Sequence, residues 1–233
     1  MQSLGSGYTA VVLGARGGIG SALADRLEAD ENCARVFRLS RNGPVSFDLT
    51  DEASVRAAAQ RLREEAGEAR LIFNATGVLD RHGYKPEKAL AAIDPVAMAA
   101  AFAINAVGAA LVLKHFHDLL PRSGKSVIAT ISARVGSIGD NRLGGWYSYR
   151  ASKAALNQIV RTSAIEITRK RREAVCVALH PGTVATELSA PHSGERETFT
   201  PQDSAARMLD DLDTLDAADS GGFFAYDGSA VPW

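Results

Sequence analysis

A short apolar run that leads directly into a glycine-rich loop constrains this chain more than any other feature. Residues Tyr8–Gly14 read YTAVVLG, a pattern that predicts a buried strand ended by glycine. The loop GARGGIG follows and opens an amphipathic helix over Gly18–Ala29. A strand, a tight glycine turn and a helix in this order are typical of α/β proteins with a parallel sheet.

The loop also predicts a phosphate site. Glycine lets the backbone turn tightly and approach a pyrophosphate, while the first turn of the helix offers free N–H groups and a positive dipole. The expected contacts to a dinucleotide are Gly14, Arg16, Gly17, Gly18, Ile19 and Gly20. The spacing G-x-x-x-G-x-G differs from the commoner fingerprint, so a simple tight connection between strand and helix is the alternative.

Strand and helix patterns alternate along the rest of the chain. Further strands are predicted at Ala34–Leu39, Val45–Phe47, Arg70–Ala75, Lys125–Ser132, Ala174–His180 and Gly222–Tyr226. Further helices are predicted at Asp51–Ala66, about Pro95–Leu120, Tyr147–Lys170 and Pro201–Leu212. No linker or repeat interrupts the pattern. We therefore expect a single α/β domain over residues 1–233, a Rossmann-type, doubly wound and mostly parallel seven-stranded sheet with helices on both faces.

The charge balance and the apolar segments narrow the possible partners. The chain has 26 basic and 27 acidic residues, which give no broad field to attract nucleic acid or anionic lipid. The start of the chain lacks the pattern of a signal peptide, and the stretch Ala97–Leu113 is alanine-rich and interrupted by Asn105. The two cysteines lie far apart, as suits a reducing compartment. We expect a cytoplasmic protein with no nucleic-acid or membrane partner and no metal site.

The end of the second strand bears on which dinucleotide binds. An acidic residue there would accept hydrogen bonds from a ribose 2′-hydroxyl and repel a 2′-phosphate. This chain has Ser40 and Arg41 instead, and Arg41 together with Arg16 can form a cationic clamp. The sequence favours NADP (NADPH) over NAD, the alternative being that both arginines are solvated surface residues.

The helix predicted at residues 147–170 begins with a tyrosine and a lysine on one face. Tyr149 and Lys153 lie four residues apart. A phenol, with a pKa near ~10, exchanges protons poorly at neutral pH unless a cation stabilises its phenolate. Lys153 provides that cation and could also hold a nicotinamide ribose. The pair is a weak signal by itself, but it follows a strand end and a glycine-rich loop.

Taken together, these motifs resemble those of the short-chain dehydrogenase/reductase family, in the same order and over nearly the whole chain. The glycine loop and the YRASK segment resemble the family's two best-known motifs. Four further matches are Asn74-Ala75-Thr76-Gly77, Asn105 within FAINAVGA, the segment PGTVAT with Pro181, Gly182, Val184 and Thr186, and the adenine-flanking pair Asp48 and Leu49. The segment GGWYSYRASKAALN and the ending FFAYDGSAVPW look most like the C-factor-like group, near the small carbonyl reductases.

The resemblance implies a hydride transfer between nicotinamide and a carbonyl or alcohol carbon. Tyr149 would be the acid/base, Lys153 would lower the cost of the phenolate, and Asn105 would anchor a water of the proton relay. The family's usual serine position is occupied by Ala133. Ser132 and Ser137 are both candidates for the missing hydroxyl and we favour Ser132, the alternative being that Ser132 bonds its own backbone and the site lacks this donor.

The leading hypothesis is therefore an NADPH-dependent oxidoreductase of a small carbonyl or alcohol compound. The alternative is a catalytically weak dinucleotide-binding sensor or signalling protein on the same fold. The segment between Thr186 and Pro201 is short and polar, which favours a small or open-sided substrate site. Trp146 either lines that site or anchors its loop. Because the family pairs its long helices, and Ala97–Ala110 offers small residues, we expect a homodimer or homotetramer.

Overall fold

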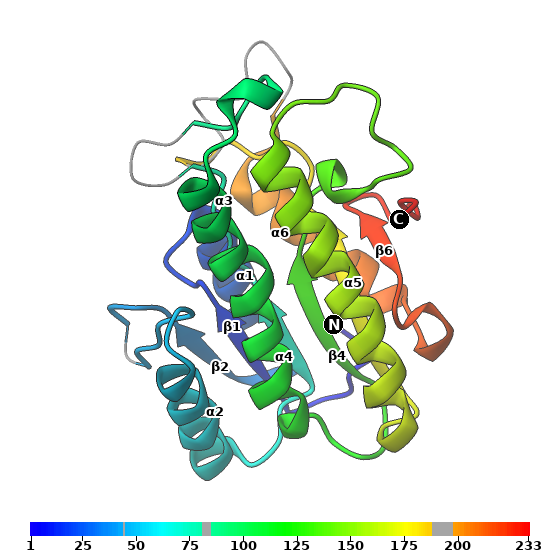
Figure 1. Cartoon of the computed structure of the whole chain (residues 1–233). Helices are drawn as coiled ribbons and strands as arrows, with labels where there is room; N and C mark the ends of the chain where they lie inside the picture. Colours follow the sequence, from blue (N-terminus) through cyan, green and yellow to red (C-terminus); the bar gives the residue numbers. More distant parts are fainter. Residues whose placement is uncertain (44, 81–84, 188–197) are drawn as a thin grey trace.

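The computed structural model describes residues 1–43, 45–80, 85–187 and 198–233. Its strands are β1 (Tyr8–Leu13), β2 (Cys33–Leu39), β3 (Leu71–Asn74), β4 (Ser126–Ile131), β5 (Ala174–His180) and β6 (Phe223–Ala225). They form one parallel sheet in the order β2-β1-β3-β4-β5-β6 (Figure 1). The chain winds outward from β1 to β2 and then in the other direction from β3. The crevice at this reversal, outside the carboxyl ends of β1 and β3, is where ligands bind in such sheets.

Helices cover both faces of the sheet. One face packs against α1 (Gly18–Glu28) and α6 (Pro201–Thr214). The other packs against α2 (Glu52–Ala66), α4 (Ala109–Phe116) and α5 (Tyr147–Lys170). α4 is the last part of a long helix. This helix begins as α3 (Pro95–Phe102), and a π-helical turn, η2 (Ala103–Gly108), joins α3 to α4. Short 3-10 turns are η1 (Leu90–Ala92), η3 (His117–Leu119), η4 (Arg134–Gly136) and η6 (Ala217–Asp219).

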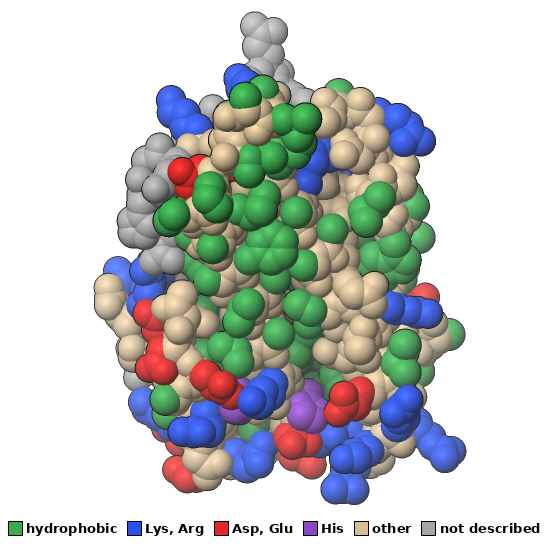
Figure 2. Space-filling view, viewed as in Figure 1, with side chains coloured by type: hydrophobic (Ala, Val, Ile, Leu, Met, Phe, Trp, Pro, Cys, Tyr) green, Lys and Arg blue, Asp and Glu red, His purple; other side chains and the backbone are tan. Residues whose placement is uncertain are grey.

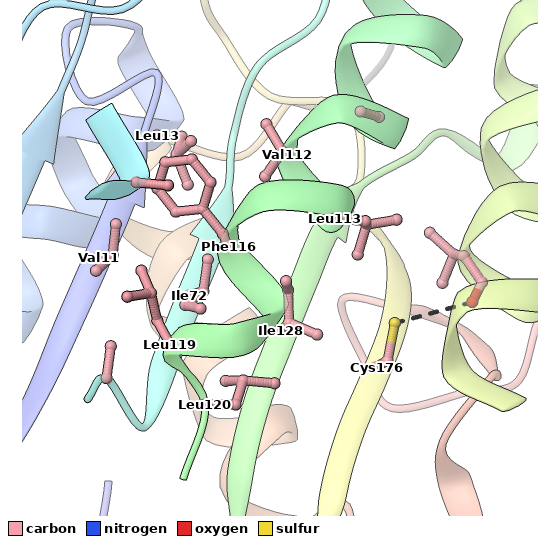
Figure 3. Close-up of a cluster of buried hydrophobic side chains, with 14 of the residues drawn as sticks. Val11, Leu13, Ile72, Val112, Leu113, Phe116, Leu119, Leu120, Ile128 and Cys176 are labelled. Atoms are coloured by element: carbon pink, nitrogen blue, oxygen red, sulfur yellow. Dashed lines mark hydrogen bonds between the residues drawn. The ribbon is translucent and has the colours of Figure 1, made fainter. Parts of the chain in front are cut away.

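The core explains why the strands are apolar on both sides. On the α4 face, Phe116 and Val112 lie over the side chains of Val11, Leu13 and Ile72 (Figure 3). The alternate residues of β1, Ala10 and Val12, point to the α1 and α6 face, where they are equally buried. Because both faces of the sheet are covered, the central strands β3, β4 and β5 are mostly apolar, and their polar residues stand near the strand ends.

The Rossmann-type α/β fold predicted from the sequence is confirmed, with one correction to the strand count. The described residues form six strands, not seven, because the predicted strand Val45–Phe47 is reduced to a single bridge between Leu39 and Val45. The chain folds back in a turn, with Gly43 N–H donating to the carbonyl of Ser40. The backbone then leaves the edge of the sheet and leads into α2.

The long helix that contains α3, η2 and α4 is apolar over most of its length. Among the described residues it is the one helix, Pro95–Leu119, long and apolar enough to cross a membrane, with a mean hydropathy of 2.2. Length and composition alone are weak evidence, since a core helix can pass the same test. Here Val112 and Phe116 are fully buried against the sheet, and 39% of the apolar window is buried inside the molecule.

Candidate active site

The glycine loop begins with two positions where only glycine fits. Gly14 has φ +82°, in the left-handed region that favours glycine. A Cβ on Gly20 would lie 2.2 Å from the carbonyl oxygen of Gly14, and Gly17 N–H donates to that same oxygen at 2.9 Å. The first turn of α1 is thereby drawn against the end of β1, which leaves the N–H groups of the helix start for a ligand.

A first cavity, of about 590 Å³, opens beside this loop. Nine of the residues predicted to bind the cofactor line it, namely Gly14, Arg16, Gly17, Ser40, Arg41, Asp48, Leu49, Ala75 and Gly77. The other lining residues were not predicted as site residues, namely Asn42, Phe47, Thr50, Thr76, Val78 and Ile104. Arg16 reaches across the opening and donates to the carbonyl of Asn42 at 3.1 Å, which brings the two predicted clamp arginines to one wall.

The residues around this cavity fit a dinucleotide. The glycine cradle excludes side chains from the loop, and the cavity continues past Ala75 and Gly77 at the end of β3. Asn74 is fully buried, and its Oδ1 accepts from the N–H and hydroxyl of Thr76 while its Nδ2 has no hydrogen-bond partner. A buried amide donor without a partner is unfavourable, so a ligand or water acceptor is expected there.

A second cavity, of about 330 Å³, lies at the carboxyl ends of β4 and β5. The predicted residues that line it are Ile19, Ser132, Tyr149, Pro181, Gly182, Val184 and Thr186. Its wall also includes residues not predicted as site residues, among them Leu79, Ala133, Arg134, Val135, Arg142, Leu143, Arg150 and His180. Trp146, for which two roles were open, lines it too. Thr186 lies against the glycine loop, because a Cβ on Gly18 would lie 2.9 Å from its methyl group.

Two of the predicted catalytic residues, Lys153 and Asn105, meet at Gly77, which lines the first cavity. A Cβ on Gly77 would lie 3.2 Å from Nζ of Lys153 and 3.4 Å from Oδ1 of Asn105. Lys153 Nζ lies 5.9 Å from the centre of the Tyr149 ring. Asn105 Nδ2 donates to Ser152 Oγ at 3.0 Å, and that hydroxyl donates to the carbonyl of Tyr149 at 2.9 Å.

Burial sets the electrostatics of this group. Lys153 is 2% exposed, and burial lowers its pKa to about 8. Its Nζ donates to the carbonyl of Ile131 at 3.0 Å, a neutral acceptor that does not balance its charge. Burial also raises the pKa of the Tyr149 phenol, so this group stays protonated at neutral pH.

The π-helical turn places Asn105 in the group. Inside η2 the helix is wider than an α-helix, a distortion common at functional sites. Asn105 is 1% exposed, and its side chain bonds the backbone of Val78 in both directions, accepting from N–H and donating to C=O at 2.9 Å each. This pair of bonds fixes the irregular segment that follows β3 against the helix that carries Asn105.

Comparison with known proteins assigns this arrangement to a family. A family model described as enoyl-(acyl carrier protein) reductase matches residues 3–231. The chain belongs to the short-chain dehydrogenase/reductase family. It is therefore an NAD(P)-dependent oxidoreductase, as the motifs predicted.

Two relatives and two solved structures illustrate the likeness. The chain is 34% identical over 189 residues to 1-hydroxy-2-glutathionyl-2-methyl-3-butene dehydrogenase of Rhodococcus sp. (strain AD45), covering 80% of this chain and 78% of that protein. It is 38% identical over 145 residues to the C-signal protein of Myxococcus xanthus, covering 62% and 84%. The NADPH-bound carbonyl reductase from chicken fatty liver superposes with a TM-score of 0.84 at 27% identity, covering 98% of this chain and 100% of that one. The carbonyl reductase Sniffer of D. melanogaster gives 0.85 at 21% identity with the same coverage, which shows the fold alone.

The serine remains the point where this chain departs from the family pattern. Ser132 lines the second cavity but is 1% exposed, and its hydroxyl donates to Oδ1 of Asn157 at 2.6 Å. Ser137 is also buried and accepts from Asp140 N–H, and it does not line that cavity. Of the two candidates, only Ser132 borders the second cavity. Its proton is already donated to a protein acceptor rather than to its own backbone.

The structure adds three polar residues that the sequence analysis did not single out. Asn157 holds Ser132, Ser152 links Asn105 to Tyr149, and buried Glu87 contacts the start of α5. The spacing of Tyr149, Lys153 and Asn157, four residues each, could have indicated one shared helix face. Glu87 gave no such signal, because its partner Ser148 lies 61 residues further along the chain.

Proposed function

We propose that this protein is an NADPH-dependent oxidoreductase that reduces a small carbonyl compound, with Tyr149 as the proton donor. One observation carries the proposal. Lys153 and Asn105 meet at Gly77 in the cavity that fits a dinucleotide, and Lys153 Nζ lies 5.9 Å from the ring centre of Tyr149, which lines the second cavity.

NADPH is favoured over NADH by the charge at the first cavity. Ser40 and Arg41 occupy the end of β2 where a carboxylate would select a 2′-hydroxyl, and both line the cavity together with Arg16. Two guanidinium groups suit the added phosphate of NADPH. The carbonyl reductase from chicken fatty liver, 27% identical, is NADPH-bound. When bound, the nicotinamide supplies the hydride.

Residues of the protein supply the proton for this reaction. Because burial keeps the Tyr149 phenol protonated, Tyr149 is poised to donate to an oxygen that gains negative charge. Lys153 would stabilise the phenolate left behind, and its lowered pKa lets it pass a proton on near neutral pH. Asn105, whose carbonyl oxygen faces Gly77, would anchor the water that returns the proton.

The second cavity limits the size of the substrate. Its volume of about 330 Å³ must also take the nicotinamide end of the cofactor, because predicted cofactor residues such as Ile19 and Thr186 line it. The remaining space, with a wall of Leu79, Val135, Leu143 and Trp146, suits a compact, partly apolar carbonyl compound. Residues 188–197, within the short segment on which the sequence expectation of a small site rested, lie outside the described residues.

The test is a turnover assay. Purified protein is mixed with NADPH and a panel of aldehydes, ketones and diketones, and NADPH consumption is followed by absorbance. Turnover that disappears in Tyr149→Phe while NADPH binding persists supports the proposal. Equal rates in wild type and Tyr149→Phe would overturn it.

A second candidate function is a dinucleotide-binding sensor or signalling protein with weak turnover. The observation that favours it is the state of the serine: Ala133 carries no hydroxyl, and Ser132 donates its own to Asn157. The C-signal protein of Myxococcus xanthus, 38% identical over 145 residues, bears a name that fits such a role. Tight NADPH binding without turnover on any carbonyl of the panel would favour this reading.

Assembly and location complete the proposal. The whole chain forms one domain, and the protein acts in the cytoplasm as a homodimer or homotetramer. Hydrophobic side chains gather over α3, α4 and α5 (Figure 2). These helices and the turn η2 carry exposed Val96, Val107 and Ile165. Pairing of this face with a second copy would bury them. Size-exclusion chromatography with light scattering tests the state directly.

A further inference from the structure

The turn in front of the catalytic helix has an unusual backbone. Gly144, Gly145 and Trp146 adopt positive φ values in succession, 65°, 65° and 54°. Glycine takes this left-handed conformation freely, but Trp146 does so at a steric cost, since its Cβ crowds the backbone. A bulky residue remains there only when its surroundings hold it.

Hydrogen bonds from two sides hold this turn. The N–H of Trp146 donates to the carbonyl of Glu87 at 2.5 Å. On the other side, the guanidinium of Arg150 donates to the carbonyls of Gly144 and Gly145 at 3.1 and 2.9 Å. Arg150 belongs to the helix itself, whereas Glu87 comes from a segment far away in sequence. Glu87 is thus the external attachment of the turn.

The Glu87 side chain also caps the helix that carries Tyr149. The N-cap residue of α5 is Trp146, which makes no side-chain capping bond. The Glu87 carboxylate takes over this task and accepts from Ser148 N–H at 3.2 Å and from the Ser148 hydroxyl. A carboxylate at a helix N-terminus is favoured by the free N–H groups and by the dipole. Glu87 is 7% exposed although Lys85 and Lys88 beside it are exposed, so the chain turns this acid inward.

These contacts connect Glu87 to the reacting site without touching it. Ser148 directly precedes Tyr149, and the rings of Trp146 and Tyr149 meet edge to face with centres 6.1 Å apart. Both rings line the second cavity. We propose that Glu87 is a positioning residue, which sets the place of Tyr149 and of the Trp146 wall by fixing the start of α5. The proposal rests on the proposed role of Tyr149.

The experiment compares Glu87→Ala and Glu87→Gln with wild type by kcat, KM and NADPH affinity. Glu87→Ala should lower kcat about tenfold to a hundredfold, since small displacements of a reacting group cost that much. NADPH affinity should stay near that of wild type, because Glu87 does not line the first cavity. Glu87→Gln keeps one acceptor oxygen and the shape of the side chain, so it should recover a good part of kcat. It is also the variant to use if Glu87→Ala fails to fold.

A second readout reports position without turnover. The chain has two tryptophans, and Trp233 stacks on Phe223 away from the turn. In a Trp233→Phe background the emission comes from Trp146 alone. Glu87→Ala should shift this emission to the red as the indole is released, and Glu87→Gln should shift it less.

The outcomes separate the positioning role from the proposed function. If Glu87→Ala is folded and both its kcat and its Trp146 emission match the background, the positioning role is wrong. A lower melting temperature with unchanged kcat and emission would also overturn it, since Glu87 would then be merely structural. If wild type shows no turnover, or Tyr149→Phe equals it, the proposed function fails instead, and the emission alone decides whether Glu87 holds the turn.

Discussion

The hydroxyl of Ser132 donates to Oδ1 of Asn157 at 2.6 Å, and both side chains are buried. The amide of Asn157 in turn donates to the carbonyl of Gly136 at 3.3 Å, so the serine is tied into the loop that follows β4. The only proton of this hydroxyl is therefore engaged before any substrate arrives. A second hydrogen-bond donor for the substrate oxygen, beside Tyr149, must therefore come from a group other than Ser132.

Ser132→Ala should destabilise the fold. Removing the hydroxyl leaves the buried Oδ1 of Asn157 without its donor, which costs about 1–3 kcal/mol. Urea denaturation followed by circular dichroism measures the change. A stability equal to that of wild type would mean that Asn157 finds another partner.

Ala133→Ser should raise kcat. Ala133 lines the second cavity, so a hydroxyl there can donate to the substrate oxygen while Ser132 stays with Asn157. A donor aimed at a developing oxyanion can contribute about 10²-fold or more, and an unoptimised one less. Steady-state reduction by NADPH measures the gain, with Ala133→Val as the control that adds bulk without a hydroxyl. A fall in kcat with both variants would show that this position has no room for the donor.

Tyr149→Phe should lower kcat by about 10²–10⁴-fold, because it removes the proton donor and leaves the ring in place. NADPH binding, followed by nicotinamide fluorescence, should persist. The edge contact with Trp146 needs no hydroxyl, so the second cavity should keep its shape. Loss of NADPH binding in this variant would contradict the separation of the two cavities.

Arg41→Ala should weaken NADPH binding and leave NADH binding nearly unchanged. Arg41 lines the first cavity just after the end of β2, where its positive charge can pair with the 2′-phosphate of NADPH. The loss of a charged hydrogen bond of about 1.5–3 kcal/mol corresponds to roughly tenfold or more in Kd. Parallel titrations with both nucleotides measure it. Equal weakening of both would remove the argument for NADP selectivity.

The stability should fall on mild acidification because of His180. Burial lowers its pKa to about 4, whereas the unfolded chain protonates at the ordinary value, so stability is lost as the pH falls from about 6.5 towards 4. Between pH 7 and 5 the loss is about 2 kcal/mol from this group. Burial raises the pKa of Asp211 to about 6, which acts in the opposite direction over the same range.

His180→Gln separates the two contributions. The variant keeps the contribution of Asp211 and removes that of His180, so its free energy of unfolding should fall by about 2 kcal/mol less than that of wild type between pH 7 and 5 in urea denaturation. Parallel pH profiles for the two proteins would mean that His180 is hydrated in the folded state.

The fold and much of the site follow from local patterns. The α5 bounds Tyr147–Lys170 and the β5 bounds Ala174–His180 agree with the sequence prediction, because long periodic or apolar segments carry their own signal. The segment Val45–Phe47 also has apolar residues, but it is too short to form an edge strand and makes a single bridge with Leu39. Cofactor residues next to glycine turns were predictable, since their chemistry is local.

What the sequence could not provide depends on partners far along the chain. Glu87 reads as a surface acid between two lysines, and only the tertiary structure turns it inward to Ser148. The engagement of Ser132 depends likewise on Asn157, 25 residues away. Such contacts have no periodicity, so no pattern of spacing reveals them.

Because of the π turn at Ala103–Gly108, the orientation of Asn105 depends on the number of residues in this helix. A π turn accommodates one residue more than the α-helix around it. Deleting a single residue within the turn would restore regular winding and leave both flanks in their present phase, so Val112 and Phe116 would keep their places on the sheet. The residues inside the turn would shift, however, and Asn105 would lose the position from which it bonds the backbone of Val78. Any chimera that exchanges this helix with a relative must therefore preserve its length as well as its apolar pattern.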